Sequence, residues 1–582
     1  MPVVAAVLTA CSIPNAPEGI GYIEPIVPEG ASGYQAKPGW STQKFAVATA
    51  NPLASDAGLQ VLRAGGSALD AAIAVQMVLG LVEPQSSGLG GGALMLMHDA
   101  RKKRLLAYDG RETAPAAARP DRFLKEGRPR EFHDAVIGGR SVGVPGVVRM
   151  LETAHRRHGR LKWAELFVPA IELAERGFAV SPRLHTLVGM DQFLTQPRAR
   201  AYFFDGNGKP LAVGTVLRNP AYAVTLRAIA AGGADAFYTG TIARDIVDTA
   251  NNHPWNPGDL TLEDLAGYRA VVREPVCDGY RTYRVCGFPL PSSGGLTVLQ
   301  MLKMLEPFDV AAMGPASFWS VHFMSEAGRL AFADRNVYMA DPAFFTPPAG
   351  LLDDTYLRER SALIRPDRSL GLATAGNPPR ANVPTRKVAL GTHAALEFES
   401  TSHISIVDRF GNAVAMTSSI EDAFGSRLMT SGGFLLNNQL TDFSFLPDEN
   451  GKPVANRVEP GKRPRSSMAP TIAYDRYGRV AIVAGSAGGP AIINFVAKTM
   501  LGIIDWNLDP QAAVALPNFG SRNGPTELEQ GTAVSALAPK LEALGVKVRM
   551  QVMTSGTQAI ARTRDGWIGG ADPRKEGAVV GR

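Results

Sequence analysis

Thr401 precedes a segment in which apolar side chains alternate with other side chains. Ile404 and Ile406 fall on one face of the expected strand and Ser405 on the other, and this two-residue period predicts a β-strand. The chain then turns through residues 409–412 and continues as a second apolar run, which predicts a β-hairpin. A threonine before a hairpin is ordinarily a surface residue, so any chemistry at this position depends on groups supplied by the rest of the chain.

Polar side chains follow other predicted strands at the points where these strands end. Arg111 comes after a strand expected over Arg104–Tyr108, and a guanidinium in such a place can bind a carboxylate through two hydrogen bonds. An exposed arginine in a local ion pair is the alternative. Polar residues also follow two apolar runs in the second half of the chain, so the segments 418–425 and 437–443 are candidates for binding residues.

A glycine pair begins an apolar helix that we expect to extend to about Ile504. Gly488 and Gly489 precede Pro490, and proline fits the first turn of a helix. The backbone N–H groups of the two glycines would then point outward at the helix N-terminus, where negative charge is stabilised. The glycine-rich stretch 88–92 instead lies between a helix and a strand, the reverse of the order in phosphate-binding loops, and we expect it to allow close packing of backbones.

The composition is that of an ordinary globular protein. The chain has 582 residues, of which 45% are hydrophobic and 20% charged, and its net charge is +6. This length can supply a large core, and the composition excludes a disordered chain. The densest basic spots, residues 101–104 and 128–130, are expected in loops. Binding to nucleic acid requires a basic face with stacking aromatic side chains; the sequence shows none, and we expect no nucleic-acid partner.

The N-terminal residues indicate export. An apolar run over Val3–Leu8 leads into a Leu-Thr-Ala-Cys sequence that ends at Cys11 and resembles the cleavage site of bacterial lipoproteins. The run is short for a signal peptide and no Lys or Arg precedes it, and a chance match is the alternative. We expect a periplasmic or envelope-anchored protein, lipidated on Cys11, with a lipoprotein signal over residues 1–10 and an exported leader and extended arm over residues 1–42.

The other two cysteines, Cys277 and Cys286, lie on either side of an Asp278-Gly279 turn signal that is off-centre between them. They would form a disulfide in an oxidising compartment and would remain two buried thiols in the cytosol. His155 and His158 lie three residues apart on a predicted helix, but no third ligand accompanies them, so we expect no metal site.

Helices and strands must position these residues. Ser67 and Asp70 form a near capping box at the start of a helix over Ala68–Val82, which is apolar nearly all round and therefore belongs to the core. The uncharged stretches are interrupted by glycine, proline and polar residues, so we expect no transmembrane span. We expect a loose connector over 366–398, helices over Pro52–Arg63, 145–157, 163–176, 296–305 and 316–334, and strands over 45–48, 93–97, 471–475 and 479–484.

Seven short motifs, taken in order along the chain, resemble those of the γ-glutamyltranspeptidases, a family of N-terminal-nucleophile hydrolases. Each motif alone is weak, but seven in the right order are a specific signal. They span about residues 45 to 570 and comprise Gly88–Gly92, Arg111–Pro115, Pro291–Gly295, Thr401–His403, Leu436–Gln439 with Asp442–Ser444, Arg463–Met468 and Gly488–Gly489.

The resemblance implies an α+β fold, a four-layer αββα sandwich. It also implies a precursor that cuts itself between Ser400 and Thr401, giving a large chain (residues 43–400 after the leader) and a small chain (residues 401–582) that stay together as a heterodimer without any cofactor. The cut would make Thr401 the first residue of a chain, with a free α-amine beside its own hydroxyl. Such an amine titrates near neutral pH and can act as the general base for that hydroxyl.

The resemblance also assigns roles to other residues. Thr401 would be the nucleophile, Ser419 would hydrogen-bond it, and the N–H groups of Gly488 and Gly489 would form an oxyanion hole. A γ-glutamyl donor is a zwitterion, so it needs both a cation and anions near the nucleophile. Its α-carboxylate would be bound by Arg111, Ser466 and Ser467, and its α-ammonium by Glu421, Gln439 and Asp442.

Three functions remain open. The first is a γ-glutamyl transferase/hydrolase that acts on glutathione and related amides and passes the acyl group to water or to an amino acid or peptide. The second is an acylase of the same mechanism that acts on glutaryl amides such as glutaryl-cephalosporins, for which Asp442 and Glu421 would have no ammonium partner. The third is a non-catalytic envelope protein, which the retention of Thr401 and Arg111 opposes.

Overall fold

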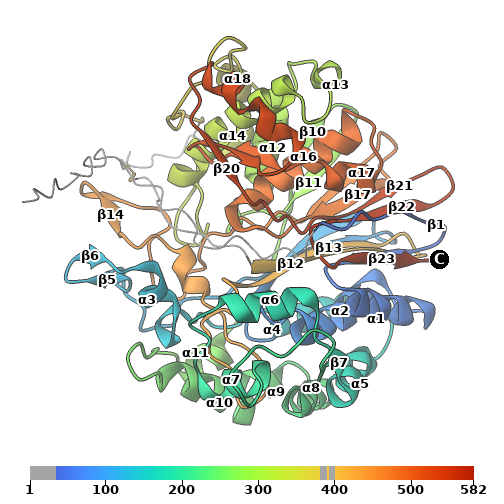
Figure 1. Cartoon of the computed structure of the whole chain (residues 1–582), viewed down its shortest axis with the longest axis vertical. Coiled ribbons are helices and arrows are strands. Elements are labelled where there is room, and N and C mark those ends of the chain that lie inside the picture. Colours follow the sequence, from blue (N-terminus) through green and yellow to red (C-terminus); the bar gives the residue numbers. More distant parts are fainter. Residues whose placement is uncertain (1–33, 380–389, 392–399) are drawn as a thin grey trace, which may run out of the picture.

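Two stacked β-sheets form the centre of the molecule in a computed structural model that describes residues 34–379, 390–391 and 400–582. Helices cover the outer face of each sheet, so the layers are helix, sheet, sheet and helix (Figure 1). The predicted four-layer αββα fold is therefore confirmed. The expected lipoprotein signal, most of the N-terminal arm and much of the connector before Thr401 lie outside the described residues.

The sheet that carries Thr401, here called the Thr401 sheet, has seven strands. Its order is β23-β2-β12-β13-β3-β4-β9, with bounds β23 (Ala578–Gly581), β2 (Ala46–Thr49), β12 (Ser400–Val407), β13 (Ala413–Glu421), β3 (Gly92–Asp99), β4 (Arg104–Gly110) and β9 (Val271–Arg273). β12 and β13 form the predicted hairpin at the centre of this sheet.

The second sheet also has seven strands and faces the first. Its order is β1-β22-β21-β17-β16-β11-β10, with bounds β1 (Trp40–Thr42), β22 (Trp567–Ala571), β21 (Gln558–Arg562), β17 (Val480–Gly485), β16 (Thr471–Tyr474), β11 (Tyr283–Gly287) and β10 (Val276–Tyr280). Segments before and after position 400 contribute strands to both sheets, so the two predicted chains would share one core.

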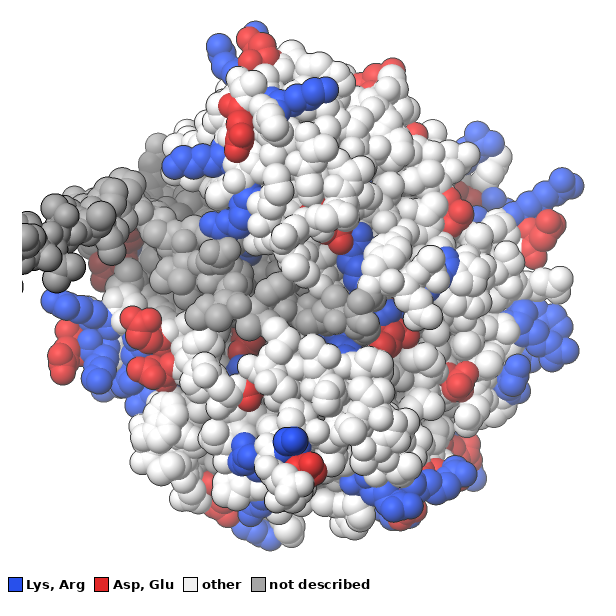
Figure 2. All heavy atoms as spheres, in the orientation of Figure 1, with Lys and Arg blue, Asp and Glu red and all other residues white. Residues whose placement is uncertain are grey.

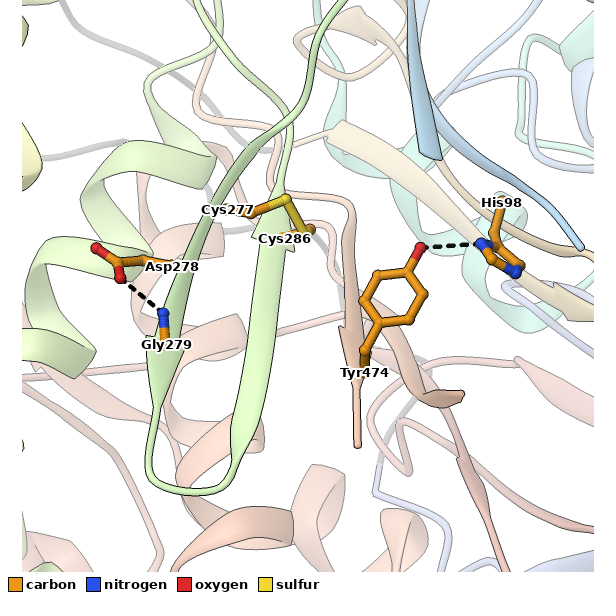
Figure 3. The surroundings of a disulfide bond; sticks show 6 residues. All are labelled: His98, Cys277, Asp278, Gly279, Cys286 and Tyr474. Carbon is orange, nitrogen blue, oxygen red and sulfur yellow. Dashed lines mark hydrogen bonds between the residues drawn. A yellow bond between two sulfur atoms is a disulfide. The ribbon is translucent and has the colours of Figure 1, made fainter. Parts of the chain in front are cut away.

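Alternation along β12 divides its side chains between two cores. Ile404 and Ile406 pack with the helices outside the Thr401 sheet, whereas Val407 packs between the two sheets. The predicted two-residue period is confirmed, but both faces of the strand are buried. A hydrogen bond of 3.0 Å between Tyr474 Oη on β16 and His98 Nδ1 on β3 also links the sheets (Figure 3).

The helices outside the Thr401 sheet begin with the two that were predicted best. α1 (Pro52–Arg63) and α2 (Ala68–Val82) have the predicted bounds, and Ser67 and Asp70 form the capping box at the start of α2. Every residue of α2 is buried. The predicted helix over 163–176 is a 3₁₀ turn η2 (Trp163–Phe167) followed by α5 (Val168–Arg176). The other helices of this part are α3 (Phe132–Val136), α4 (Val147–His158), α5 (Val168–Arg176), α6 (Pro182–Met190), α7 (Pro197–Phe203), α8 (Pro220–Gly232), α9 (Asp235–Tyr238), α10 (Gly240–Asn251) and α11 (Leu262–Gly267).

A second helical layer covers the other sheet. It includes α14, whose 21 residues are the longest run of helix among the described residues and extend four residues beyond the predicted end. The helices are α12 (Gly294–Leu305), α13 (Val310–Met313), α14 (Phe318–Tyr338), α15 (Asp354–Ser361), α16 (Ile492–Ile504), α17 (Pro510–Ala515) and α18 (Ala538–Glu542). Short strands complete the fold: β5 (Leu124–Lys125), β6 (Arg128–Pro129), β7 (Phe178–Ala179), β8 (Val216–Leu217), β14 (Asp448–Glu449), β15 (Lys452–Pro453), β18 (Phe519–Ser521), β19 (Thr526–Glu529) and β20 (Val548–Gln551).

Cys277 and Cys286 are disulfide-bonded across the β10–β11 hairpin (Figure 3). They are direct partners in the antiparallel register, with Cα atoms 4.0 Å apart. The prediction of a turn at Asp278-Gly279 is wrong, because both residues belong to β10 and the chain reverses at Arg281, which takes a left-handed φ of 52°. This later turn centres the hairpin between the two cysteines.

The surface agrees with the expectations from charge and hydropathy. On the face shown in Figure 2, basic and acidic side chains are interspersed around the margin. Residues 101–103 are exposed in the turn between β3 and β4, as expected, but Arg104 begins β4 and Arg128–Pro129 form the short strand β6, so the loop prediction is wrong for these three residues. Across the described residues, no helix combines the length and the apolar character needed to cross a bilayer.

Candidate active site

Thr401 lies at an irregularity in the central hairpin. Ser400 pairs with Glu421 and Thr401 with Ser419, so one step along β12 matches two steps along β13. This is the geometry of a β-bulge, a feature that often re-aims side chains beside active sites. Glu421 has a φ of 82°, which is rare for a residue with a side chain. The strand therefore changes its path at the bond between Ser400 and Thr401.

A chain of hydroxyl groups connects Thr401 to the carbonyl group that precedes it. Thr401 Oγ1 donates to Ser419 Oγ at 3.3 Å, and Ser419 Oγ donates to the carbonyl oxygen of Ser400 at 2.8 Å. The backbone N–H of Glu421 also donates to Ser419 Oγ, at 2.8 Å, and fixes the orientation of this hydroxyl. Ser419 thus contacts the predicted nucleophile and the predicted scissile peptide together.

Arg111 follows β4, as predicted, and its guanidinium is buried. Its Nη2 forms an ion pair with Asp442 and donates to the carbonyl oxygen of Arg465 at 3.0 Å. Its Nε donates to the carbonyl oxygen of Pro464 at 3.1 Å. The surface ion pair considered as an alternative is therefore wrong, since the partner lies 331 positions away and the pair is buried.

The acidic side of the site rests on the 3₁₀ turn η4 (Gln439–Asp442). Gln439 Nε2 donates to Asp442 Oδ2 at 2.8 Å, while the other amide atom, Oε1, is buried without a hydrogen-bond partner in the described part of the chain. Asn438 donates to the carboxylate of Glu421. Glu421, Gln439 and Asp442 are thereby held on one side of the site, with acceptor oxygens that could bind a cation.

The two serines Ser466 and Ser467 lie in a loop that pairs with the motif before α12. Ser466 N donates to the carbonyl oxygen of Pro291 at 3.1 Å, and Ser293 N donates to that of Ser466 at 2.8 Å. Ser292 Oγ donates to the carbonyl oxygen of Met468 at 2.6 Å. The motif at 291–295 therefore contributes to the site by fixing the backbone of this loop.

Gly488 and Gly489 both have left-handed backbone conformations, with φ of 124° and 49°. They precede a short 3₁₀ turn η5 (Gly489–Ala491), and α16 begins at Ile492. A Cβ atom at Gly488 would lie 2.5 Å from the ring of Phe495, so the position requires glycine for space as well as for φ. The predicted helix start is confirmed, with a tighter first turn.

One pocket with about 280 Å³ of empty space brings most of the predicted residues together. Its lining contains nine of the ten predicted catalytic and binding residues, and Gly488 is the exception; Met468 and Ile492 complete the wall. The predicted lining residues are Arg111, Thr401, Ser419, Glu421, Gln439, Asp442, Ser466, Ser467 and Gly489. A hydroxyl, a guanidinium and two carboxylates thus face one small space.

Comparison with known sequences decides the family. The model of the family described as Gamma-glutamyltranspeptidase matches residues 54–582. The chain belongs to the γ-glutamyltranspeptidase family. The glutathione hydrolase proenzyme of Bacillus subtilis strain 168 is 36% identical over 543 residues, which cover 92% of this chain and 91% of the relative.

Acylases are also among the similar proteins. The acylase ACY 1 proenzyme of Pseudomonas sp. strain SE83 is 36% identical over 536 residues, 90% of this chain and 91% of the relative. The crystal structure of a cephalosporin acylase from Bacillus halodurans superposes with a TM-score of 0.80 at 28% identity, and covers 96% of this chain and 99% of that one. Family membership alone therefore does not decide between γ-glutamyl amides and glutaryl amides as substrates.

Two residues that contact the lining of the pocket were not singled out from the sequence. Glu112 is buried beside Arg111, with its Oε2 3.8 Å from Arg111 Nη1. Desolvation raises the pKa of Glu112 to about 8, although the guanidinium acts in the opposite direction. Arg335 on α14 donates to Ser467 Oγ at 2.5 Å. Glu112 lies inside a motif that was noted for its neighbour, whereas Arg335 is one of two arginines in α14 and gives no signal in the pattern.

His403, two residues after Thr401, lies between the two sheets. Its ring hydrogen-bonds Thr417 Oγ1 at 2.8 Å and Ser405 Oγ at 3.0 Å, and burial lowers its pKa to about 3. It is therefore a neutral structural histidine beside the nucleophile position. The other histidines considered have structural contacts too: His158 lies 3.2 Å from Asp99 and bonds Tyr108 Oη at 2.8 Å, and His155 contacts the carbonyl oxygen of Leu161.

Proposed function

We propose that this chain is a self-cleaving γ-glutamyl transferase/hydrolase with Thr401 as its nucleophile. The observation that carries the proposal is the pocket in which the Thr401 hydroxyl, the Arg111 guanidinium and the Asp442 carboxylate meet. Glutathione and related γ-glutamyl amides are the donors, in line with the relatives named glutathione hydrolase proenzymes. Water or the amine of an amino acid or peptide is the acceptor.

Self-cleavage begins with attack of Thr401 Oγ1 on the carbonyl carbon of Ser400. The bond between this carbon and the Thr401 nitrogen breaks, the proton of the hydroxyl passes to this nitrogen, and the acyl group moves from nitrogen to oxygen. Ser419 already donates to the Ser400 carbonyl oxygen, so it stabilises the negative charge that develops there. Water then hydrolyses the ester, which leaves a carboxylate on Ser400 and a free α-amine on Thr401.

Turnover repeats the same attack on the donor. The new α-amine of Thr401 takes the proton of its own hydroxyl, which attacks the γ-carbonyl carbon and forms a γ-glutamyl ester. The amine of the leaving group receives the proton, and water or an acceptor amine then attacks the ester. Gly489, which lines the pocket at the start of the 3₁₀ turn η5, and its neighbour Gly488 supply N–H groups for the oxyanion.

The α-carboxylate and α-ammonium of a γ-glutamyl donor are attached to one carbon atom. A site that binds both must therefore hold a cation and an anion side by side, as the buried pair of Arg111 and Asp442 does. Without a donor these two groups neutralise each other, which offsets the cost of burying them. Glu421 and Gln439 add acceptors on the ammonium side, and Ser466 and Ser467 add hydroxyls on the carboxylate side.

The alternative function is hydrolysis of glutaryl amides, which the similarity to a cephalosporin acylase favours. A glutaryl group lacks the ammonium, so the carboxylates of Asp442 and Glu421 would meet no cation on the donor. Both carboxylates line the pocket, so a donor with an ammonium group gains charge-assisted hydrogen bonds there that a glutaryl donor cannot make. This supports the γ-glutamyl donor as the better substrate.

Release of an aniline from matched γ-glutamyl and glutaryl anilides tests the choice. We expect the γ-glutamyl compound to be cleaved with the higher kcat/KM. Faster release from the glutaryl compound would assign the protein to the acylases instead. Adding a dipeptide to the γ-glutamyl reaction and measuring the new γ-glutamyl product would then divide transfer from hydrolysis.

We further propose that the chain is exported and held at the envelope through Cys11, with residues 43–400 and 401–582 as the two chains of the mature enzyme. The apolar run before Cys11 and the disulfide between Cys277 and Cys286 support export. Cell fractionation of wild-type and Cys11→Ser protein tests the anchor. The wild type should sediment with membranes and the variant should not, and equal sedimentation would contradict lipidation at Cys11.

A further inference from the structure

A buried arginine on α14 reaches the carboxylate side of the pocket from behind. Arg335 is only 3% exposed, and its Nη2 donates to Ser467 Oγ at 2.5 Å. Its Nε donates to Ser293 Oγ at 2.8 Å. Ser467 lines the pocket, so this guanidinium is one side chain removed from the space that the donor would occupy.

The direction of the first hydrogen bond determines what Ser467 can do. A guanidinium carries only donors, so the Ser467 oxygen accepts from Arg335 and the Ser467 hydroxyl directs its own proton to a different group. A hydroxyl that accepts from a cation is polarised and becomes a better donor, because consecutive hydrogen bonds strengthen one another. An anionic oxygen in the pocket is the acceptor that gains most from such a donor.

The second hydrogen bond connects Arg335 to the other serine of the pair. Ser293 Oγ, which accepts from Arg335 Nε, donates to the carbonyl oxygen of Ser466 at 2.8 Å. In return, Arg465 Nη1 donates to the carbonyl oxygen of Arg335 at 3.1 Å. α14 and the loop at 465–467 are thus bound together through the guanidinium groups of Arg335 and Arg465, which fix the positions of both Ser466 and Ser467.

We propose that Arg335 is a positioning residue that makes the serine pair selective for an anion on the α-carbon of the donor. Arg335 does not touch the donor; it orients the Ser467 hydroxyl toward the α-carboxylate and adds a buried positive charge on the carboxylate side of the pocket. The inference rests on the proposed γ-glutamyl function. It adds that recognition of the carboxylate depends on α14, an element outside every motif that suggested the site.

The test compares two donors that differ only at the α-carbon. A γ-glutamyl anilide carries the α-carboxylate, and a 4-aminobutyryl anilide lacks it. For Arg335→Gln we expect KM for the γ-glutamyl anilide to rise about tenfold or more, the loss typical of a hydrogen bond to a charged group, with little change in kcat. The kinetics with the 4-aminobutyryl anilide should stay close to those of the wild type.

Matched variants separate positioning from general damage. Arg329→Gln removes another buried arginine of α14, which contacts Glu326, Gly371 and Gly524 instead of the serine loop. This variant should leave unchanged the ratio of kcat/KM for the γ-glutamyl anilide to kcat/KM for the 4-aminobutyryl anilide. Arg335→Lys keeps the charge but cannot reach both serines, so its kcat/KM ratio should lie between those of the wild type and Arg335→Gln. If Arg335→Gln does not fold, the lysine variant provides the test. Ser467→Ala should also lower this kcat/KM ratio. The double variant Ser467→Ala with Arg335→Gln should have no lower ratio than either single variant.

The outcomes distinguish this inference from the proposed function. An equal loss with both donors, or an unchanged KM for the γ-glutamyl anilide, would overturn the role of Arg335 while wild-type turnover still supported the γ-glutamyl function. A wild-type enzyme that released no aniline from the γ-glutamyl compound would overturn both. Selective loss with the α-carboxylate donor, restored in part by Arg335→Lys, would support the inference.

Discussion

Replacement of Ser419 by alanine should slow self-cleavage without preventing folding. The side chain donates one hydrogen bond, to the Ser400 carbonyl oxygen at 2.8 Å. Such a bond contributes about 0.5–1.5 kcal/mol to a neutral acceptor and about 1.5–3 kcal/mol to a charged one. The difference, about 1–1.5 kcal/mol, is the part that acts only in the transition state, and it predicts cleavage about 5- to 12-fold slower, compared with the 10²–10³-fold typical of lost oxyanion donors.

The rate can be followed as loss of the 582-residue precursor on a denaturing gel after purification of uncut protein. Ser419→Thr is the matched control because it keeps the hydroxyl, and its rate should stay near that of the wild type. Thr401→Ala gives the baseline, since it lacks the nucleophile. If Ser419→Ala protein is cut as fast as the wild type, the hydrogen bond to the Ser400 carbonyl oxygen has no role in the reaction.

Three further changes test other parts of the account. Arg111→Ala should leave self-cleavage intact and raise KM for a γ-glutamyl anilide about tenfold or more; uncut protein on a denaturing gel would contradict this separation. Asp442→Asn should lower kcat/KM for the γ-glutamyl anilide and not for the glutaryl anilide, and a parallel loss would show that the carboxylate does not recognise the ammonium. His403 protonates near pH 6.5 in the unfolded chain but near pH 3 in the folded one, so its contribution to the free energy of unfolding is present at neutral pH and is lost as pH falls below 6.5. Between pH 7 and 5 this loss of stability is about 2 kcal/mol. Urea unfolding of uncut Thr401→Ala protein should show the loss, and adding His403→Gln should remove it. If the double variant keeps the same pH dependence of stability, another group titrates in this range.

Local signals in the sequence were sufficient to predict the elements with strong boundaries. Pro52 and the glycines after Arg63 fixed the limits of α1, and the capping box did so for α2. The turn of the β10–β11 hairpin was placed wrongly because Asp278-Gly279 has the composition of a turn. β11 also pairs with β16, and this sheet context places Asp278 and Gly279 inside β10.

The order of the motifs predicted which residues form the site. It did not predict the contacts between these residues. Nothing in the spacing shows that Arg111 pairs with Asp442, since the fold alone brings together positions 331 residues apart. The bulge at Ser400 and Thr401 depends on the register between two strands, which a period along one strand does not reveal. Arg335 escaped notice because a buried arginine within a long helix resembles a structural one until its hydrogen bonds to the serine loop are seen.

The identity of the chain ends shows whether Thr401 is an N-terminal nucleophile. Intact mass measurement of the purified wild-type protein, after separation on a denaturing gel, should show two chains, and the smaller should consist of the 182 residues that begin at Thr401. Thr401→Ala protein should give one chain and no γ-glutamyl turnover. A wild-type protein that releases the γ-glutamyl group while its chain stays whole would contradict the assignment of Thr401 as an N-terminal nucleophile.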